Sequence, residues 1–349
     1  MASHLGWENR TSFFWERPLG TGETTGILWL SAEADSMGLG AEATRRRVYG
    51  NRYMLNAHLQ VLKSNPGGSL GATELFFDRA GTQTTLNRML NTHFQNTAAA
   101  CPVPPLPCWV AHFPVNEQPA SLSGFTIARD IGLDFGSAYV WESCVCNELV
   151  LDWQPGKAMT IKPTFVALDG QPDTAAPGIV ATDVSYQYQL YQAPNIACTW
   201  NGSKVETAGF TITSNNGIVV KHDPSSISPV GMTLGNWAAK LQLKVWVDDD
   251  FYKYVPNSLG SSVPIDTTGT FEAVITGPTV SDESGSSFTY MGTVHFHGKV
   301  VDMPNAQPTK DGIQIINVEM TSPETGGSYD DAGYFIKIDS SSFPWQLVV

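Results

Sequence analysis

Two pairs of residues in the sequence have the spacing of potential metal ligands. Cys144 and Cys146 are separated by one residue, as are His295 and His297. In a β-strand, residues two positions apart point to the same side of the sheet. A structural zinc site needs four ligands, and no second cysteine pair or histidine stands at ligand spacing from the cysteines. We therefore expect the cysteines to be buried small residues, and the histidines, which lack a third ligand, to face solvent or a subunit interface.

The other candidate chemical signals point away from an enzyme. Asp248, Asp249 and Asp250 lack the glycine and terminal glutamate of an EF-hand loop, and they favour a helix N-terminus, where carboxylates complement the helix dipole. The sequence contains no nucleophile elbow, HExxH zinc motif, P-loop or dinucleotide fingerprint. We expect no catalytic residues and no cofactor.

Arg45, Arg46 and Arg47 form a basic run with three open interpretations: a solvated loop, a contact with an acidic surface of a neighbouring subunit, or phosphate binding. Residues 1–176 carry 12 basic and 16 acidic side chains, a net of −4, and residues 177–349 carry 8 and 17, a net of −9. This asymmetry permits complementary contacts between unlike halves of adjacent chains.

The composition favours a protein that assembles with copies of itself. Only 15% of the 349 residues are charged, against about 25% in an ordinary soluble domain, so we expect a neighbouring subunit to cover part of the surface. The net charge of −13 disfavours nucleic-acid binding. No apolar run approaches the roughly 20 residues of a membrane span. Five cysteines without regular spacing predict a reduced, intracellular chain rather than a secreted disulfide framework.

The first half of the chain is predicted to be mostly strands. Residues 1–25 lack periodicity and are expected to form an N-terminal arm. The elements expected after it are a strand at 26–35, a long loop at 37–51, an alternating strand at 52–63, a helix at 86–94, a loop at 95–122, and strands at 125–130, 139–152 and 159–168.

The order of elements then starts again. Residues 170–178 are the expected linker, because they are rich in glycine and proline. The elements expected after it are a hairpin at 197–213, a long loop at 218–237, an alternating strand at 240–247, a short helix at 251–255, and strands at 270–276, 288–303, 313–322 and 334–340. This pattern predicts two tandem domains, 26–176 and 177–349, so that three chains could build a ring of six similar units.

Several motifs occur in an order that resembles one known family. They are Gly202-Ser203-Lys204-Val205, the segment 211–216, and Asp249-Asp250 followed by Phe251, Tyr252 and Tyr254. Upstream, 146–151 with Pro155-Gly156 and 160–168 add to the pattern. This combination resembles the major tail tube proteins of long-tailed bacteriophages, with matched regions over about a third of the chain.

The resemblance implies a mainly β fold: two tandem tail-tube-like β-sandwich or barrel domains with short flanking helices. It implies a structural protein of the virion tail, made in the host cytoplasm. Its rings, each of three chains or alternatively six, would stack around a lumen that holds the tape measure protein and passes viral DNA without specific binding. Tail terminator and tail tip proteins would be its other partners, and no membrane is involved.

Two sets of residues are expected to serve this assembly. The first would make contacts between rings or subunits: Arg45, Arg46, Arg47, Tyr49, His222, Asp223, Asp248 and Asp249. The second would line the lumen from the two alternating strands: Asn56, His58, Gln60, Lys240, Gln242 and Lys244. The sign of the lumen charge stays open, because the second strand presents lysines while the whole chain is acidic.

Two other classes of protein remain open. One is another virion component, such as a capsid decoration protein or a tail terminator. The other is a carbohydrate-binding β-sandwich or an enzyme, because the 10 tryptophans and 11 tyrosines would suit stacking on sugars.

Overall fold

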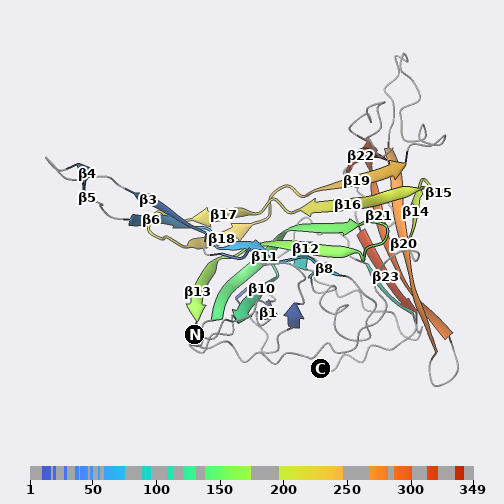
Figure 1. Cartoon of the computed structure of the whole chain (residues 1–349). Helices are drawn as coiled ribbons and strands as arrows, with labels where there is room; N and C mark the ends of the chain where they lie inside the picture. The colour runs from blue at the N-terminus through green and yellow to red at the C-terminus, as the bar shows by residue number, and fades with distance from the viewer. Residues whose placement is uncertain are drawn as a thin grey trace, which may run out of the picture.

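The computed structural model places most of its described residues in β-strands (Figure 1). The described residues are 10–16, 19–20, 27–29, 36–38, 40–45, 48–49, 54–55, 59–74, 89–90, 92–95, 108–112, 121–130, 138–173, 196–246, 268–281, 287–300, 313–320 and 335–341. Within these ranges, the helical residues are Met89, Leu90, Thr92 and His93. The predicted mainly β fold is confirmed, with these helical residues inside the predicted helix 86–94; the predicted helix at 251–255 lies outside the described residues.

A first antiparallel sheet contains the N-terminal strand. Its order is β2 (Ile27–Trp29), β1 (Arg10–Glu16), β10 (Gly124–Asp130), the first part of β11 (Ala138–Trp153) and β13 (Asp169–Asp173). β1 buries Phe13 and Phe14, and the ring of Phe13 meets that of Phe125 edge-on at 5.3 Å. The prediction of an arm is therefore wrong for β1, because burying two aromatic rings against β10 fixes this segment inside the sheet.

Strand β11 passes from the first sheet into a second one. Its path changes at Ser143, which has a φ of 51°. The buried carboxylate of Glu16 stabilises this position: it accepts hydrogen bonds from the Ser143 N–H and hydroxyl, both at 3.1 Å, and from the hydroxyl of Thr126. A buried carboxylate with this many donors is satisfied, so Glu16 fixes the junction of the two sheets.

The second sheet draws strands from both halves of the chain. Beside β12 (Thr160–Val166) lie the short strands β7 (Gly67–Ser69) and β8 (Thr73–Glu74), and the order then continues through β11, β16 (Thr207–Asn215), β19 (Ala238–Trp246), β22 (Ile313–Met320), β21 (Ser287–Val300), β20 (Thr268–Ser281), β14 (Ile196–Trp200) and β15 (Ser203–Lys204). β23 (Phe335–Ser341) pairs with another part of β21, and β9 (Cys108–His112) pairs with β23.

Three of these pairings bear on the predicted organisation. β9 lies within 95–122, which was expected to be a loop, and β13 extends into the expected linker 170–178 as far as Asp173; both expectations are wrong at those strands. The antiparallel pairing of β11 with β16 crosses the predicted domain boundary at 176/177. The two halves thus share one hydrogen-bonded sheet, and their division into two domains stays a prediction.

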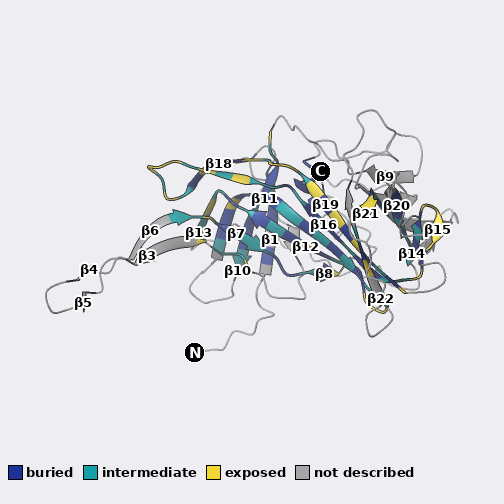
Figure 2. Ribbon diagram, turned by 90° about the horizontal axis from the view of Figure 1, so that it is seen from above, coloured by how far each residue is buried: buried dark blue, intermediate teal, exposed yellow. Residues whose placement is uncertain are grey.

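The core lies where the second sheet folds back on itself. The ring of Phe210 on β16 packs edge-on against that of Phe271 on β20, with 5.1 Å between centroids, as in a β-sandwich. On β19, Leu241 and Leu243 are buried while Gln242 between them is exposed, an alternation that Figure 2 shows as changing colours along the strand. The predicted alternating strand at 240–247 is confirmed, since period-two burial requires one apolar and one polar face.

Three short strand pairs, which belong to two hairpins, extend away from these sheets (Figure 1). They are β17 (Val219–His222) with β18 (Pro229–Thr233), β3 (Ala41–Arg45) with β6 (Leu59–Ser64), and β4 (Val48–Tyr49) with β5 (Met54–Leu55). The expectation of irregular loops at 37–51 and 218–237 is wrong for these strands. In β17 and β18 exposure does not follow residue type, since Val219 and Val230 are exposed while Pro229 and Met232 are buried, so periodicity did not predict these two strands.

Candidate assembly surface

Two of the hairpins are joined to each other. The backbone N–H of Ser64, at the end of β6, donates to the carbonyl of Ile227 in the β17–β18 turn at 3.0 Å. The imidazole Nε2 of His222 lies 2.9 Å from Oδ1 of Asn65. β3, β4, β5, β6, β17 and β18 therefore form one structure, which we call the projection (Figure 1).

The turn of the β17–β18 hairpin is organised by Asp223. Its Oδ1 accepts hydrogen bonds from the backbone N–H of Ser225 at 2.7 Å and from the Ser225 hydroxyl at 2.5 Å. These bonds lower the pKa of the Asp223 carboxyl below its usual value. The carboxylate is exposed as well as bonded, so the tip of the hairpin carries a fixed negative charge.

The same hairpin also exposes aliphatic side chains. Val219, Ile227 and Val230 are 56%, 51% and 59% exposed. Single exposed aliphatic residues are common on protein surfaces, but three on one short hairpin that leaves the body are suited to a contact with another surface.

The structure brings four of the predicted contact residues onto the projection. Arg45 ends β3, Tyr49 ends β4, His222 ends β17, and Asp223 follows His222. The other members of that set, Arg46, Arg47, Asp248 and Asp249, lie outside the described residues. Sequence reasoning missed the aliphatic residues of the β17–β18 hairpin; a signal was present in Val219-Val220 within an otherwise polar stretch.

The predicted lumen residues are separated by the fold. Lys240 and Gln242 are exposed and Lys244 is half-buried, all on the open face of β19. Gln60 belongs to β6, which pairs with β3 in the projection, whereas β19 pairs with β16 and β22. Gln60 and the residues of β19 therefore belong to different sheets of the chain, and their place at a lumen stays a prediction. Asn56 and His58 lie outside the described residues.

The open side of β19 belongs to a wider surface, which we call the polar face. Its members are half-buried or exposed and come from four adjacent strands: Thr160, Lys162 and Thr164 from β12; Glu148 and Asp152 from β11; Thr211, Thr213 and Asn215 from β16; and Lys240, Gln242 and Lys244 from β19. Sequence reasoning found only the members on β19, because the strand order that places the others beside it is a tertiary property.

The carboxylates of the polar face are engaged with neighbouring strands. The Thr211 hydroxyl donates to Asp152 Oδ1 at 2.5 Å. The Asn215 amide donates to Glu148 Oε2 at 3.3 Å. These residues include three lysines, on β12 and β19, and two carboxylates, on β11, so the surface is polar without being dominated by one sign of charge.

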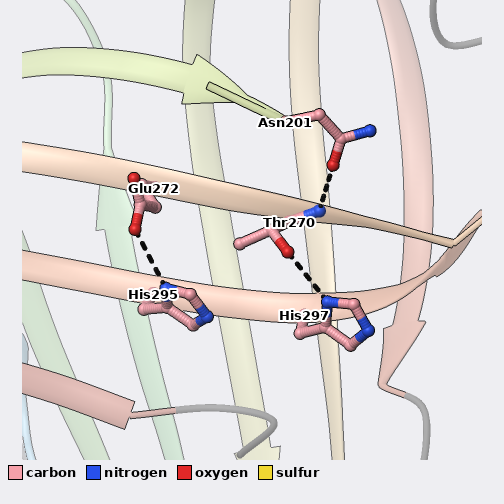
Figure 3. A network of polar contacts seen from close by, with 5 residues as sticks. All are labelled: Asn201, Thr270, Glu272, His295 and His297. Carbon is pink, nitrogen blue, oxygen red and sulfur yellow. Dashed lines mark hydrogen bonds and ion pairs between the residues drawn. The ribbon is translucent and has the colours of Figure 1, made fainter. Parts of the chain in front are cut away.

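The histidine pair lies on β21 and is paired with β20 (Figure 3). His295 Nδ1 is 3.1 Å from Glu272 Oε1, and His297 Nδ1 is 2.8 Å from the Thr270 hydroxyl. Asn201 Oδ1 in turn accepts from the Thr270 N–H at 2.8 Å. His295 is buried, so the expectation of a solvent-facing pair is wrong for it. Each imidazole is instead part of the cross-strand pairing of β20 and β21.

The cysteine pair has the predicted structural character. Cys144 and Cys146 are buried free thiols, and burial raises the pKa of both well above the ordinary value. Cys198 is also buried and free, with its pKa raised to about 12. Thiols with raised pKa values are poor nucleophiles at neutral pH, so these residues act as small core side chains. In the part of the chain that the structure describes, no three histidine, cysteine or acidic residues are grouped as a metal site.

Comparisons with known proteins leave the surface to be interpreted from its own geometry. No protein-family model matches the chain, and no curated protein matches it. Among the described residues, no helix has both the length and the apolar character of a membrane span.

Proposed function

We propose that this protein is a structural subunit of a bacteriophage tail tube, in which copies of the chain form rings that stack around a lumen. The observation that carries the proposal is the projection: hairpins from distant parts of the sequence leave a β-sandwich body together, and they expose Val219, Ile227 and Val230 to solvent. Such an element suits an axial contact, because it reaches beyond the body that would form each ring. The resemblance of the sequence to major tail tube proteins supports the same assignment.

The polar face suits the wall of a channel for DNA. Its lysines are accompanied by the carboxylates of Glu148 and Asp152, which accept hydrogen bonds from adjacent strands. With three lysines and two carboxylates, the face carries only a small excess of positive charge, so it would release few counterions from DNA and hold it weakly. In this proposal the tape measure protein occupies the lumen before DNA passes.

The number of chains in a ring is part of the proposal. If the two halves of the chain are equivalent units, three chains supply the six units of a ring. If they are not, six chains are needed. The direct pairing of β11 with β16 would hold the two halves at a fixed orientation in either ring.

The test is electron microscopy of the purified chain, alone and with tail tip proteins as nucleus. We expect hollow tubes with threefold or sixfold rotational symmetry. In a variant with Arg45, Arg46 and Arg47 replaced by Glu, we expect folded subunits that do not stack. Isolated trimers of the unaltered chain that never polymerise would identify a decoration protein, and turnover of a small molecule would identify an enzyme.

A further inference from the structure

A buried group of polar residues lies at the base of the β17–β18 hairpin. We call it the His93 knot; its members are His93, Ser214, Asn216 and Trp237. His93 Nε2 and the Ser214 hydroxyl share a hydrogen bond of 2.7 Å. The indole N–H of Trp237 donates to the same hydroxyl at 3.0 Å. His93, Ser214 and Asn216 are buried, so these bonds form away from water.

The side-chain amide of Asn216 ties this knot to the body. Its Nδ2 donates to the His93 carbonyl at 2.7 Å and to the Cys146 carbonyl at 2.8 Å. The Asn216 backbone N–H donates to the carbonyl of Asn147 at 2.7 Å, and the Ile218 N–H donates to Asn147 Oδ1 at 2.9 Å. The chain that leaves β16 for the hairpin is therefore bound to β11 and to the helical turn at His93.

The returning leg of the hairpin is held at the same place. The Gly235 N–H donates to the Asn216 carbonyl at 3.2 Å. A Cβ added to Gly235 would lie 2.1 Å from the Gly217 carbonyl oxygen, so the two legs are as close as their backbones permit. Trp237 follows on this leg and bonds to Ser214 on the other. Both legs thus meet the knot immediately before the hairpin extends from the body.

We infer that His93 is a positioning residue: it fixes the direction in which the β17–β18 hairpin leaves the body. This inference rests on the proposed function in so far as that direction serves contacts between rings. A hairpin without a core of its own has little to orient it except its two ends. Its far end is hydrogen-bonded to Ser64 and Asn65 at the base of the β3–β6 hairpin. The knot is the connection through which the sandwich can orient the β17–β18 hairpin, because buried hydrogen bonds that are fully paired hold one geometry. The β3–β6 hairpin has its own connection to the sandwich through Gly38, Pro66 and Gly67.

The experiment is hydrogen exchange, read by mass spectrometry, on the purified unassembled chain. In His93→Leu we expect amides of the β17–β18 hairpin, 219–233, to exchange at least tenfold faster, while those of β11 and β12 keep their rates. Trp237→Phe removes one hydrogen bond from a half-buried ring and should give a smaller change in the same direction. This variant replaces His93→Leu in the experiment if His93→Leu does not fold. His93→Gln can keep a polar contact to Ser214 and should restore part of the protection.

Thr92→Val is the matched control. Thr92 is buried on the same helical turn, but its hydroxyl has no hydrogen-bond partner among the described residues, so the variant should exchange like the unaltered chain. Equal acceleration over all strands in His93→Leu and Trp237→Phe, or no change in the hairpin, would overturn the positioning role.

Tube formation by the unaltered chain, scored separately, tests the proposed function. If the unaltered chain fails to form tubes, the proposed function is wrong, but the exchange result still tests the positioning role of His93. If the unaltered chain forms tubes and hairpin exchange is unchanged in the variants, the positioning role of His93 is wrong and the proposed function is supported.

Discussion

The imidazole of His93 is enclosed by protein, and this burial lowers its pKa from 6.5 to about 3. As pH falls below 6.5, the unfolded chain binds a proton at His93 that the folded chain does not bind. The stabilising contribution of neutral His93 is therefore complete above pH 6.5 and is lost as pH falls towards 3. We expect a loss on the order of 4 kcal/mol in the free energy of unfolding across that range.

Denaturant unfolding at pH 7, 5 and 4 checks this expectation. His93→Leu should be less stable than the unaltered chain at pH 7 but should show a flatter dependence on pH, whereas Thr92→Val should keep the original dependence. If His93→Leu and the unaltered chain lose stability in parallel, another group is responsible for the acid sensitivity.

Gly235 offers a second prediction at the residue scale. An alanine Cβ there would meet the Gly217 carbonyl oxygen at 2.1 Å. The two backbone segments are held together by the hydrogen bond from the Gly235 N–H to the Asn216 carbonyl. We expect Gly235→Ala to cost about 2–4 kcal/mol of unfolding free energy, because the two backbone segments must move apart to admit the Cβ. Gly231→Ala, on the same hairpin, has no atom within 4 Å of the new Cβ and should change stability by less than about 1 kcal/mol. Equal effects of the two substitutions in thermal unfolding would refute the close approach as the cause.

At the scale of elements, the strands of the body and those of the projection differ in what stabilises them. β11, β16 and β19 each bury one side in the core, and their sequences alternate accordingly. β17 and β18 are stabilised by their mutual pairing and by the knot, and they expose Val219 and Val230 while β18 buries Met232. This contrast explains why the first group could be predicted from periodicity and the second could not.

The exposed aliphatic residues of the projection lead to a prediction about assembly. Replacing Val219, Ile227 and Val230 together by Thr keeps β-branched side chains, so the fold should stay within about 1 kcal/mol of its original stability. Because the triple variant loses apolar area that another copy would cover, we expect at least a tenfold higher protein concentration to be needed for tube formation. Sedimentation and electron microscopy measure the protein concentration at which tubes form.

Ile315→Thr is the control for that experiment, since Ile315 is a comparably exposed aliphatic residue on β22, outside the projection. It should leave the concentration for assembly nearly unchanged. An equal effect of Ile315→Thr and of the triple variant would show that general surface hydrophobicity, and not the projection, drives polymerisation.

At the scale of the whole molecule, the polar face predicts weak interaction with DNA. Gln242 is exposed on β19 with Lys240 and Lys244 on the same face, so Gln242→Lys would create a row of three positive charges. We expect tubes of this variant to retain duplex DNA at low salt and to release it as salt rises, because phosphate contacts release counterions. Tubes of the unaltered chain and of Gln242→Glu should not retain DNA. A filter-binding series in salt checks this; equal retention by the Lys and Glu variants would place β19 away from the DNA path.

The sequence by itself determined the mainly β character, the alternating strand at 240–247 and the buried, unreactive nature of Cys144 and Cys146, because these follow from local periodicity and composition. Only the tertiary structure decided that Arg10–Glu16 is an interior strand, that β11 pairs with β16, and that His93 meets the base of a hairpin more than a hundred residues away. The physical reason is that strand partners and buried polar contacts form between segments distant in the chain. Their energies depend on which surfaces meet, and no short window of sequence carries that information.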